Sequence, residues 1–251
     1  MNIHFNCTQC TKCCQHTKIP VTVAESIDWL NDGNQIQVLC EASPWMPAEE
    51  LKAAYLMQRS FAARSGTLPI RVTVTLIAKV AGNCPNLLPD TRCRIYERRP
   101  LVCRIYPAEI NPFTQLDPHK KGCPPEAWSS NYPVLQRSDG TTVAPVHEDI
   151  QRFRSTNTSD IPAKQKLCAA LNLTTAAVSQ EAFFIYSLPM TDIQQALSAL
   201  KTETPTDSAK MQWQLITDRD QTLARLNEAC AMAAHPRDVP AGPYEFIGLK
   251  T

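Results

Sequence analysis

Glycine is scarce in this chain of 251 residues, which holds 7 glycines against 20 prolines. A glycine-rich loop of the kind that cradles phosphate groups is therefore not found, and rigid, irregular connections are expected instead. The chain also lacks a charge imbalance, because its formal net charge is only +1. The overall charge thus gives no support to nucleic acid or an anionic membrane as a partner.

An extended apolar segment is missing as well. The most apolar stretch, VTVTLIAKVAG at 72–82, alternates with polar residues and contains Lys79, so it is too short and too polar to span a bilayer. The first residues do not form the basic region and apolar run of a secretory signal. With 43% hydrophobic and 20% charged residues, the composition is typical of a globular protein. We expect a cytoplasmic protein without a membrane partner.

Cysteine is abundant, with 11 residues. Cytoplasmic thiols are kept reduced, and an odd number cannot pair completely, so metal ligation or redox chemistry is expected before structural disulfides. Eight of them form two groups of four in the first half of the chain: Cys7, Cys10, Cys13 and Cys14, then Cys84, Cys93, Cys103 and Cys123. The isolated Cys40, Cys168 and Cys230 lie in apolar helical patterns and are interpreted as core thiols.

The first group has the sequence CTQCTKCC at 7–14, in which two successive pairs of cysteines are each separated by two residues. Such spacing lets one tight turn bind a soft metal, and it is used both by bacterial ferredoxins and by structural zinc sites. The spacing therefore predicts a metal site without choosing between iron–sulfur and zinc, and a metal-free redox or disulfide cluster is the alternative. The adjacent Cys13 and Cys14 are not expected to point into one compact site, so one of them is predicted to serve a second centre or a redox role.

The segment CRIYERRPLVCRIYP at 93–107 is rich in arginine. Thiolate ligands leave a metal centre negative, and nearby arginines offset that charge and tune a cluster's potential. We therefore predict cofactor-binding roles for Arg94, Arg99 and Arg104. A solvated basic face, or a nucleic-acid patch with stacking aromatics, is the alternative. Three histidines near the cysteines are interpreted as surface residues, although each could replace a thiolate: His4, His16 and His119.

Periodicity predicts a mixture of helices and strands. A strand over 70–80 is expected to form a hairpin with 93–96, which would bring Cys84 and Cys93 close together. The predicted helices cover 23–30, 47–66, 147–154, 162–172, 174–187, 191–200 and 207–234. The expected fold class is α+β: a small irregular cysteine-ligated metal domain with a short hairpin over 1–125, followed by a mainly helical region of unknown role over 126–251.

The cysteine segments together resemble a known family. CTQCTKCC, then NCPNLL, then CRIYERRPLVCRIYP and a further cysteine are similar to the YkgJ-type cysteine-cluster family, a zinc- or iron-chelating group with a CxxCxxCC motif. The flagellin lysine methylase FliB looks like a relative. The resemblance covers roughly residues 5–125 and includes Tyr96, Arg99-Pro100, Cys103-Arg104 and Tyr106-Pro107. It implies that the metal ligands are Cys7, Cys10, Cys13, Cys14, Cys84, Cys93, Cys103 and Cys123. By similarity to the methylase branch it implies an iron–sulfur cluster, and by the wider description zinc.

The sequence thus predicts a metal-binding protein with an iron–sulfur cluster, expected to be 4Fe-4S, or with zinc. Its expected role is redox, sensing or binding of an unidentified protein or redox partner. One alternative is a lysine N-methylase-like enzyme. Against it, no glycine-rich loop for a methyl donor is present, and Thr17 stands where a radical-type motif would need its third cysteine. The other alternative is a structural zinc module that presents a protein-binding surface. No catalytic residues are identified.

Overall fold

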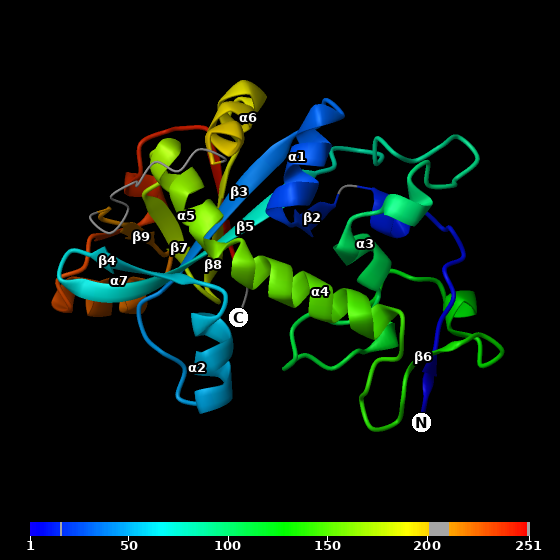
Figure 1. Ribbon diagram of the computed structural model, residues 1–251. Coiled ribbons are helices and arrows are strands. Elements are labelled where there is room, and N and C mark those ends of the chain that lie inside the picture. The colour runs from blue at the N-terminus through cyan, green and yellow to red at the C-terminus, as the bar shows by residue number, and fades with distance from the viewer. Residues whose placement is uncertain (16, 201–210, 250–251) are drawn as a thin grey trace. The chain divides into compact units, whose positions relative to one another are not determined.

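Two compact units, each made of two chain segments, form the computed structural model (Figure 1). The structure describes residues 1–15, 17–200 and 211–249. The cysteine unit consists of Met1–Val21 and Ala78–Thr156, and the sheet unit consists of Thr22–Ile77 and Asn157–Thr251. The predicted boundary at residue 125 falls inside the cysteine unit, and the roles assigned to the two parts of the chain stay predictions.

The sheet unit is built around β3 (Ile36–Ser43), in which six of the eight residues are buried, as in a strand covered on both faces. It pairs in parallel with β7 (Thr175–Val178) and antiparallel with β8 (Ala182–Tyr186). The parallel order then continues from β7 to β9 (Gln214–Ile216) and β10 (Ala233–Ala234). Strand β11 (Tyr244–Gly248) pairs antiparallel with β8.

A hairpin of β4 (Phe61–Ser65) and β5 (Leu68–Lys79) also belongs to this sheet. Gly66 makes its tight turn possible, because its φ of +58° suits glycine and an added Cβ would meet the backbone oxygen of Cys230. The helices of the unit are α1 (Val23–Asn31), α2 (Glu50–Met57), α5 (Ile161–Ala170), α6 (Met190–Ala199) and α7 (Asp220–Glu228).

The cysteine unit has little regular structure. Its strands and α-helices are β1 (Ile3–His4), β2 (Lys18–Val21), β6 (Val134–Gln136), α3 (Leu101–Ile105) and α4 (Val146–Ser159), the last of which extends past the unit. Four 3₁₀ turns cover Lys12–Cys14, Tyr96–Arg98, Pro118–Lys120 and Pro125–Trp128. Strands β1 and β6 pair antiparallel. These short elements leave most of the unit as loops, which hold most of its cysteines.

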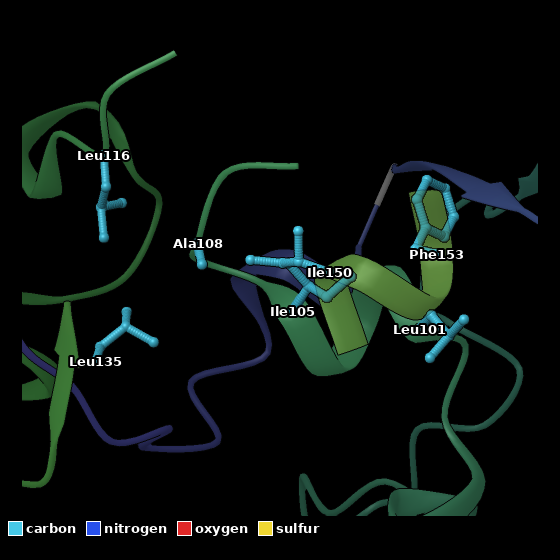
Figure 2. Close-up of a cluster of buried hydrophobic side chains, with 7 residues drawn as sticks. All are labelled: Leu101, Ile105, Ala108, Leu116, Leu135, Ile150 and Phe153. Atoms are coloured by element: carbon cyan, nitrogen blue, oxygen red, sulfur yellow. The ribbon is translucent and has the colours of Figure 1, made fainter. Parts of the chain in front are cut away.

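A small apolar core organises these loops (Figure 2). Leu101 and Ile105 of α3 pack in one cluster with Ile150 and Phe153 of α4. The remaining members come from the connecting segments: Ala108, Leu116 and Leu135. Because α3 is anchored in this way, the position of Cys103 in the middle of that helix is fixed by the core.

The predicted α+β class is confirmed, and so are several elements. The helices over 23–30, 147–154, 162–172 and 191–200 and the strand over 70–80 appear as α1, α4, α5, α6 and β5. None of the described helices is long and apolar enough to cross a bilayer.

Other predicted elements are wrong. The helix over 47–66 ends at Met57, and β4 begins at Phe61. The segment 174–187 forms β7 and β8, and the long helix over 207–234 is replaced in its described part by β9, α7 and β10, while 207–210 lie outside the described residues. The residues 93–96 form no strand; Leu87 and Cys93 make an isolated antiparallel bridge instead. Strands β7 to β11 therefore lie among the helices of the region that was predicted to be mainly helical.

Candidate metal centre

Backbone hydrogen bonds join the two groups of cysteines. The N–H of Cys84 donates to the carbonyl oxygen of Cys14 over 2.7 Å. Next to this bond, Gln15 and Asn83 form an antiparallel bridge. The last cysteine of the first group and the first cysteine of the second are therefore held side by side, although Cys84 follows Cys14 by 70 positions in the sequence.

A tight loop then brings Cys84 and Cys93 together. The N–H of Leu87 donates to the carbonyl oxygen of Cys84 over 2.9 Å, and Leu87 bridges to Cys93. Burial raises the pKa of the Cys84 thiol, and the negative charge of the Cys93 thiolate raises it further. The predicted proximity of the two cysteines is thus present, but it comes from this loop rather than from the expected hairpin with β5.

Helix α3 contributes Cys103. The helix begins after Pro100, to which the Cys103 N–H donates over 2.9 Å, and its apolar side is buried at Leu101 and Ile105. Burial is the main reason that the pKa of Cys103 rises to about 12, with the negative charges of Cys13 and Cys84 next in importance. The thiol therefore stays protonated until a cation replaces its proton.

The loop between two 3₁₀ turns contributes Cys123. The phenol oxygen of Tyr106 accepts a hydrogen bond from the Gly122 N–H over 3.1 Å, and its O–H donates to the Cys123 sulfur, which lowers the pKa of that thiol. Burial is the larger influence and raises that pKa, as do the charges of the thiolates of the first group: Cys13, Cys10 and Cys7. Every one of the eight cysteines thus lies within electrostatic reach of another member of the set.

The adjacent Cys13 and Cys14 point the same way. Their Sγ atoms lie 3.9 Å apart at the end of the 3₁₀ turn Lys12–Cys14. The expectation that one of them serves a second centre or a redox role stays a prediction. A hydrogen bond from the Cys14 thiol is the chief cause that lowers the pKa of Cys13 to about 6. The same bond, together with burial and the charge of Cys13, raises the pKa of Cys14. Cys13 is therefore the thiol of the pair that is ready to act as a thiolate at neutral pH.

The three predicted arginines have different surroundings. Arg99 stacks its guanidinium 3.7 Å above the ring centroid of Tyr96, and its positive charge lowers the pKa of Cys13 and of Cys103. Arg104 forms an ion pair with Asp149 at 2.9 Å. Arg94 donates to the side-chain oxygen of Asn86 over 3.0 Å. The charge of Arg99 thus acts on two of the thiols, and the cofactor-binding roles of all three arginines stay predictions.

The remaining sequence-based interpretations have mixed outcomes. All eleven cysteines are free thiols; Cys40 and Cys168 are buried as expected, whereas Cys230 is exposed, so its interpretation as a core thiol is wrong. The ring of His4 donates to the carbonyl oxygen of Tyr132 over 2.7 Å. His16 lies outside the described residues.

Two neighbours of the thiols were not singled out from the sequence. Asn86 follows Cys84 by two residues, and its backbone N–H hydrogen-bonds the Cys84 sulfur. The contribution of the Tyr106 hydroxyl to Cys123 was also missed, although Tyr106 belongs to the motif that carried the family resemblance. The sequence signal for both was their short distance from a cysteine or a motif residue.

The donor set fits a soft metal. Across the described residues, no group of three or more histidine, cysteine, aspartate and glutamate side chains is already arranged as a metal site. The chemistry of the donors nevertheless suits zinc or iron–sulfur, because thiolates are the ligands these metals prefer. The 3.9 Å between the Cys13 and Cys14 sulfurs is close to the edge of about 3.8 Å that a tetrahedral site with Zn–S bonds near 2.3 Å requires. These two thiols would therefore reach one metal ion with little movement.

The eight thiols come from several segments of one compact unit, one of which is helix α3, and their number and type are typical of a thiolate metal-binding domain. The comparison with family models agrees: residues 6–124 match the CxxCxxCC family, described as "Putative zinc- or iron-chelating domain". Over these residues the chain is similar to the CxxCxxCC family. No curated protein and no solved structure matches the chain. The relation to the flagellin lysine methylase stays a prediction.

Proposed function

We propose that the cysteine unit binds an iron–sulfur cluster, expected to be 4Fe-4S, and serves a redox or sensing role in the cytoplasm. The observation that carries the proposal is the 2.7 Å backbone hydrogen bond from Cys84 to Cys14, which unites two groups of four thiols. The proposed ligands are Cys7, Cys10, Cys13, Cys14, Cys84, Cys93, Cys103 and Cys123. Eight thiols exceed the four that one cluster needs, so they suffice for two centres or for one centre with spare redox thiols.

A bound cluster would supply a centre that accepts and releases one electron. The chain's own residues would hold it and balance its charge. Arg99 lies where its positive charge already favours the thiolates of Cys13 and Cys103. Tyr106 donates to the Cys123 sulfur, and such hydrogen bonds to ligand sulfur tune the potential of a cluster. We propose that the electron partner is another protein, not nucleic acid or a membrane.

Zinc is the second candidate, and one distance favours it. The sulfurs of Cys13 and Cys14 are 3.9 Å apart, which suits two thiolates on the same metal ion. In a 4Fe-4S cluster held by four cysteines, each iron takes one thiolate. A zinc-bound cysteine unit would be a structural module that presents a protein-binding surface. The lysine N-methylase alternative stays a prediction on which the described geometry does not bear.

Serine substitutions test the ligand set. We expect Cys10→Ser and Cys103→Ser to lower the metal content per chain and the melting temperature, because metal binding energy is folding energy at such sites. The loss of affinity should exceed the roughly 10–100-fold that removal of an outer hydrogen bond costs. Metal analysis and thermal melts of anaerobically purified protein provide the measurement.

The matched control is Cys230→Ser, which changes an exposed cysteine of the sheet unit. It should keep the wild-type metal content and melting temperature. Full metal content and unchanged melting in both Cys10→Ser and Cys103→Ser would contradict the assignment of ligands.

A further inference from the structure

Asn86 is a buried amide between two of the proposed ligands. It follows Cys84 by two residues, and only 2% of its surface is exposed. Its backbone N–H hydrogen-bonds the Cys84 sulfur, and its carbonyl oxygen accepts the N–H of Arg94 over 2.7 Å. Arg94 directly follows Cys93. The Asn86–Arg94 pair therefore closes the loop whose ends carry the two thiols.

Only one of the two polar atoms in the Asn86 side chain has a hydrogen-bond partner. Its Oδ1 accepts a hydrogen bond from Nη2 of Arg94 over 3.0 Å, but its Nδ2 is buried and has no hydrogen-bond partner. The amide cannot be turned round to repair this, because Nδ2 would then face the donor of Arg94. A buried N–H group without an acceptor costs about 1–3 kcal/mol, so such a group calls for an explanation.

We propose that Asn86 is a positioning residue whose Nδ2 donates a hydrogen bond to a sulfur atom of the bound metal centre. The inference rests on the proposed metal-binding function. Two observations support it: the unpartnered donor is buried within two residues of Cys84, and the backbone N–H of the same residue already hydrogen-bonds that cysteine's sulfur. The acceptor would be a ligand thiolate, or a bridging sulfide if the centre is an iron–sulfur cluster. Hydrogen bonds of this kind hold ligands in place and tune a metal centre.

Arg94 has a different task from the charge compensation that its sequence position suggests. Arg94 donates two hydrogen bonds to Asn86, one from its backbone N–H and one from its guanidinium. Arg99, in contrast, acts through its charge on the thiols of Cys13 and Cys103, whose pKa values it lowers. Arg94 therefore acts through Asn86, by orienting the amide so that its N–H groups face the centre.

The first experiment compares Asn86→Asp with Asn83→Asp. Both remove an amide donor, but Asn83 is exposed, and its described contact is the backbone bridge to Gln15. Two probes are used on the full chain: zinc affinity by competition with a chromogenic chelator, and the sulfur-to-metal charge-transfer absorption of the cobalt(II) form. We expect Asn86→Asp to bind zinc about 10–100-fold more weakly and to shift the cobalt absorption. Asn83→Asp should match the wild type in both.

The second experiment separates orientation from charge at Arg94. Arg94→Lys keeps the positive charge but loses the planar guanidinium that donates to the amide oxygen of Asn86. We expect it to weaken zinc binding and shift the cobalt absorption as Arg94→Met does, and we expect neither to add to the effect of Asn86→Asp. Wild-type behaviour of Arg94→Lys would show that charge alone matters and would overturn the role assigned to Arg94.

The outcomes distinguish the inference from the function on which it rests. If the wild type binds metal and Asn86→Asp binds it equally well with the same absorption, the inference is wrong and the proposed function stands. If the wild type binds neither zinc nor cobalt nor iron, both are wrong. A lower melting temperature of the metal-free Asn86→Asp protein with an unshifted cobalt absorption would show a purely structural asparagine and also overturn the inference.

Discussion

Individual residues of the same type do different work in this chain because of their neighbours. Arg94 donates a hydrogen bond to the amide oxygen of Asn86, and Arg99 stacks on the ring of Tyr96. Arg104 forms an ion pair with the buried carboxylate of Asp149. The sequence segment places all three near cysteines, but it does not show which partner each guanidinium finds. Hydrogen-bond geometry decides this, since a planar guanidinium binds wherever a fixed acceptor matches its fork.

Lys164 of α5 gives a pH-dependent prediction. Burial lowers its pKa to about 8. The residue is 4% exposed, and its Nζ donates a hydrogen bond to the side-chain oxygen of Asn157 over 2.7 Å. Because this folded-state pKa lies below the usual 10.5, the unfolded chain binds more protons between those values. The buried ammonium of Lys164 therefore lowers the unfolding free energy by its full amount below about pH 8. This destabilisation decreases as the pH rises from about 8 to 10.5.

The variant Lys164→Met isolates this effect. We expect its advantage in unfolding free energy over the wild type to shrink by about 2–3 kcal/mol as the pH rises through that window. Urea denaturation of both proteins at a series of pH values measures the difference. A difference that does not change with pH would contradict the prediction.

Among the helices, α3 and α4 are joined by an ion pair that lies next to Cys103, one of the proposed ligands. Arg104 of α3 meets Asp149 of α4 at 2.9 Å, and the Asp149 side chain is only 6% exposed. We expect Asp149→Ala to destabilise the cysteine unit by about 1–3 kcal/mol, because it leaves Arg104 without its partner. The double variant Asp149→Leu with Arg104→Met should cost less than the single one.

Metal content separates this structural role from a role in charge compensation. If Arg104 serves mainly to join the two helices, the double variant should still bind metal with close to wild-type affinity. Denaturation curves and metal analysis of the same samples provide both readouts. Strong metal loss with unchanged stability would instead support the cofactor-binding role predicted for Arg104.

The elements that could be predicted were those with clear local signals. Helix α1 begins with the capping box of Thr22 and Glu25, which is a local sequence motif. In β5, apolar and polar residues alternate regularly over much of the strand. The segment 174–187 was mistaken for a helix because its apolar residues also fit helical spacing. There, Gln180 adopts a φ of +69°, the chain turns back, and β8 pairs with β3, which lies about 140 residues earlier. Such distant pairing overrides local propensity and cannot be read from the segment itself.

The candidate site was predictable in its composition but not in its details. Cysteine spacing and the family resemblance indicated which thiols to consider, and the structure brings all eight of them into one unit. The direction of Cys13 and Cys14 was not predictable, because it depends on the 3₁₀ turn and on the left-handed φ of +64° at Thr11. The unpartnered amide of Asn86 was also hidden, since only a three-dimensional count of donors and acceptors reveals it.

For the whole molecule, the two units are expected to respond differently to metal removal. All eight proposed ligands lie in the cysteine unit, whose apolar core is small and whose elements are short. Metal binding would therefore supply much of its stability, whereas the sheet unit is held by its own hydrogen-bonded strands. We expect a chelator to remove amide-exchange protection from the cysteine unit while β3, β7 and β9 keep theirs. Equal loss in both units, or no loss in either, would contradict this expectation.

The central claim is that the eight thiols hold a metal centre, and one measurement tests it most directly. The full chain is purified without oxygen, its absorption spectrum is recorded, and iron, zinc and acid-labile sulfide are counted per chain. We predict broad thiolate-to-iron absorption with iron and sulfide in matching amounts, which would establish an iron–sulfur cluster. Zinc without sulfide would make the cysteine unit a structural zinc module. The absence of both iron and zinc from the purified protein would contradict the account, because the reactive groups would then be the metal-free thiols.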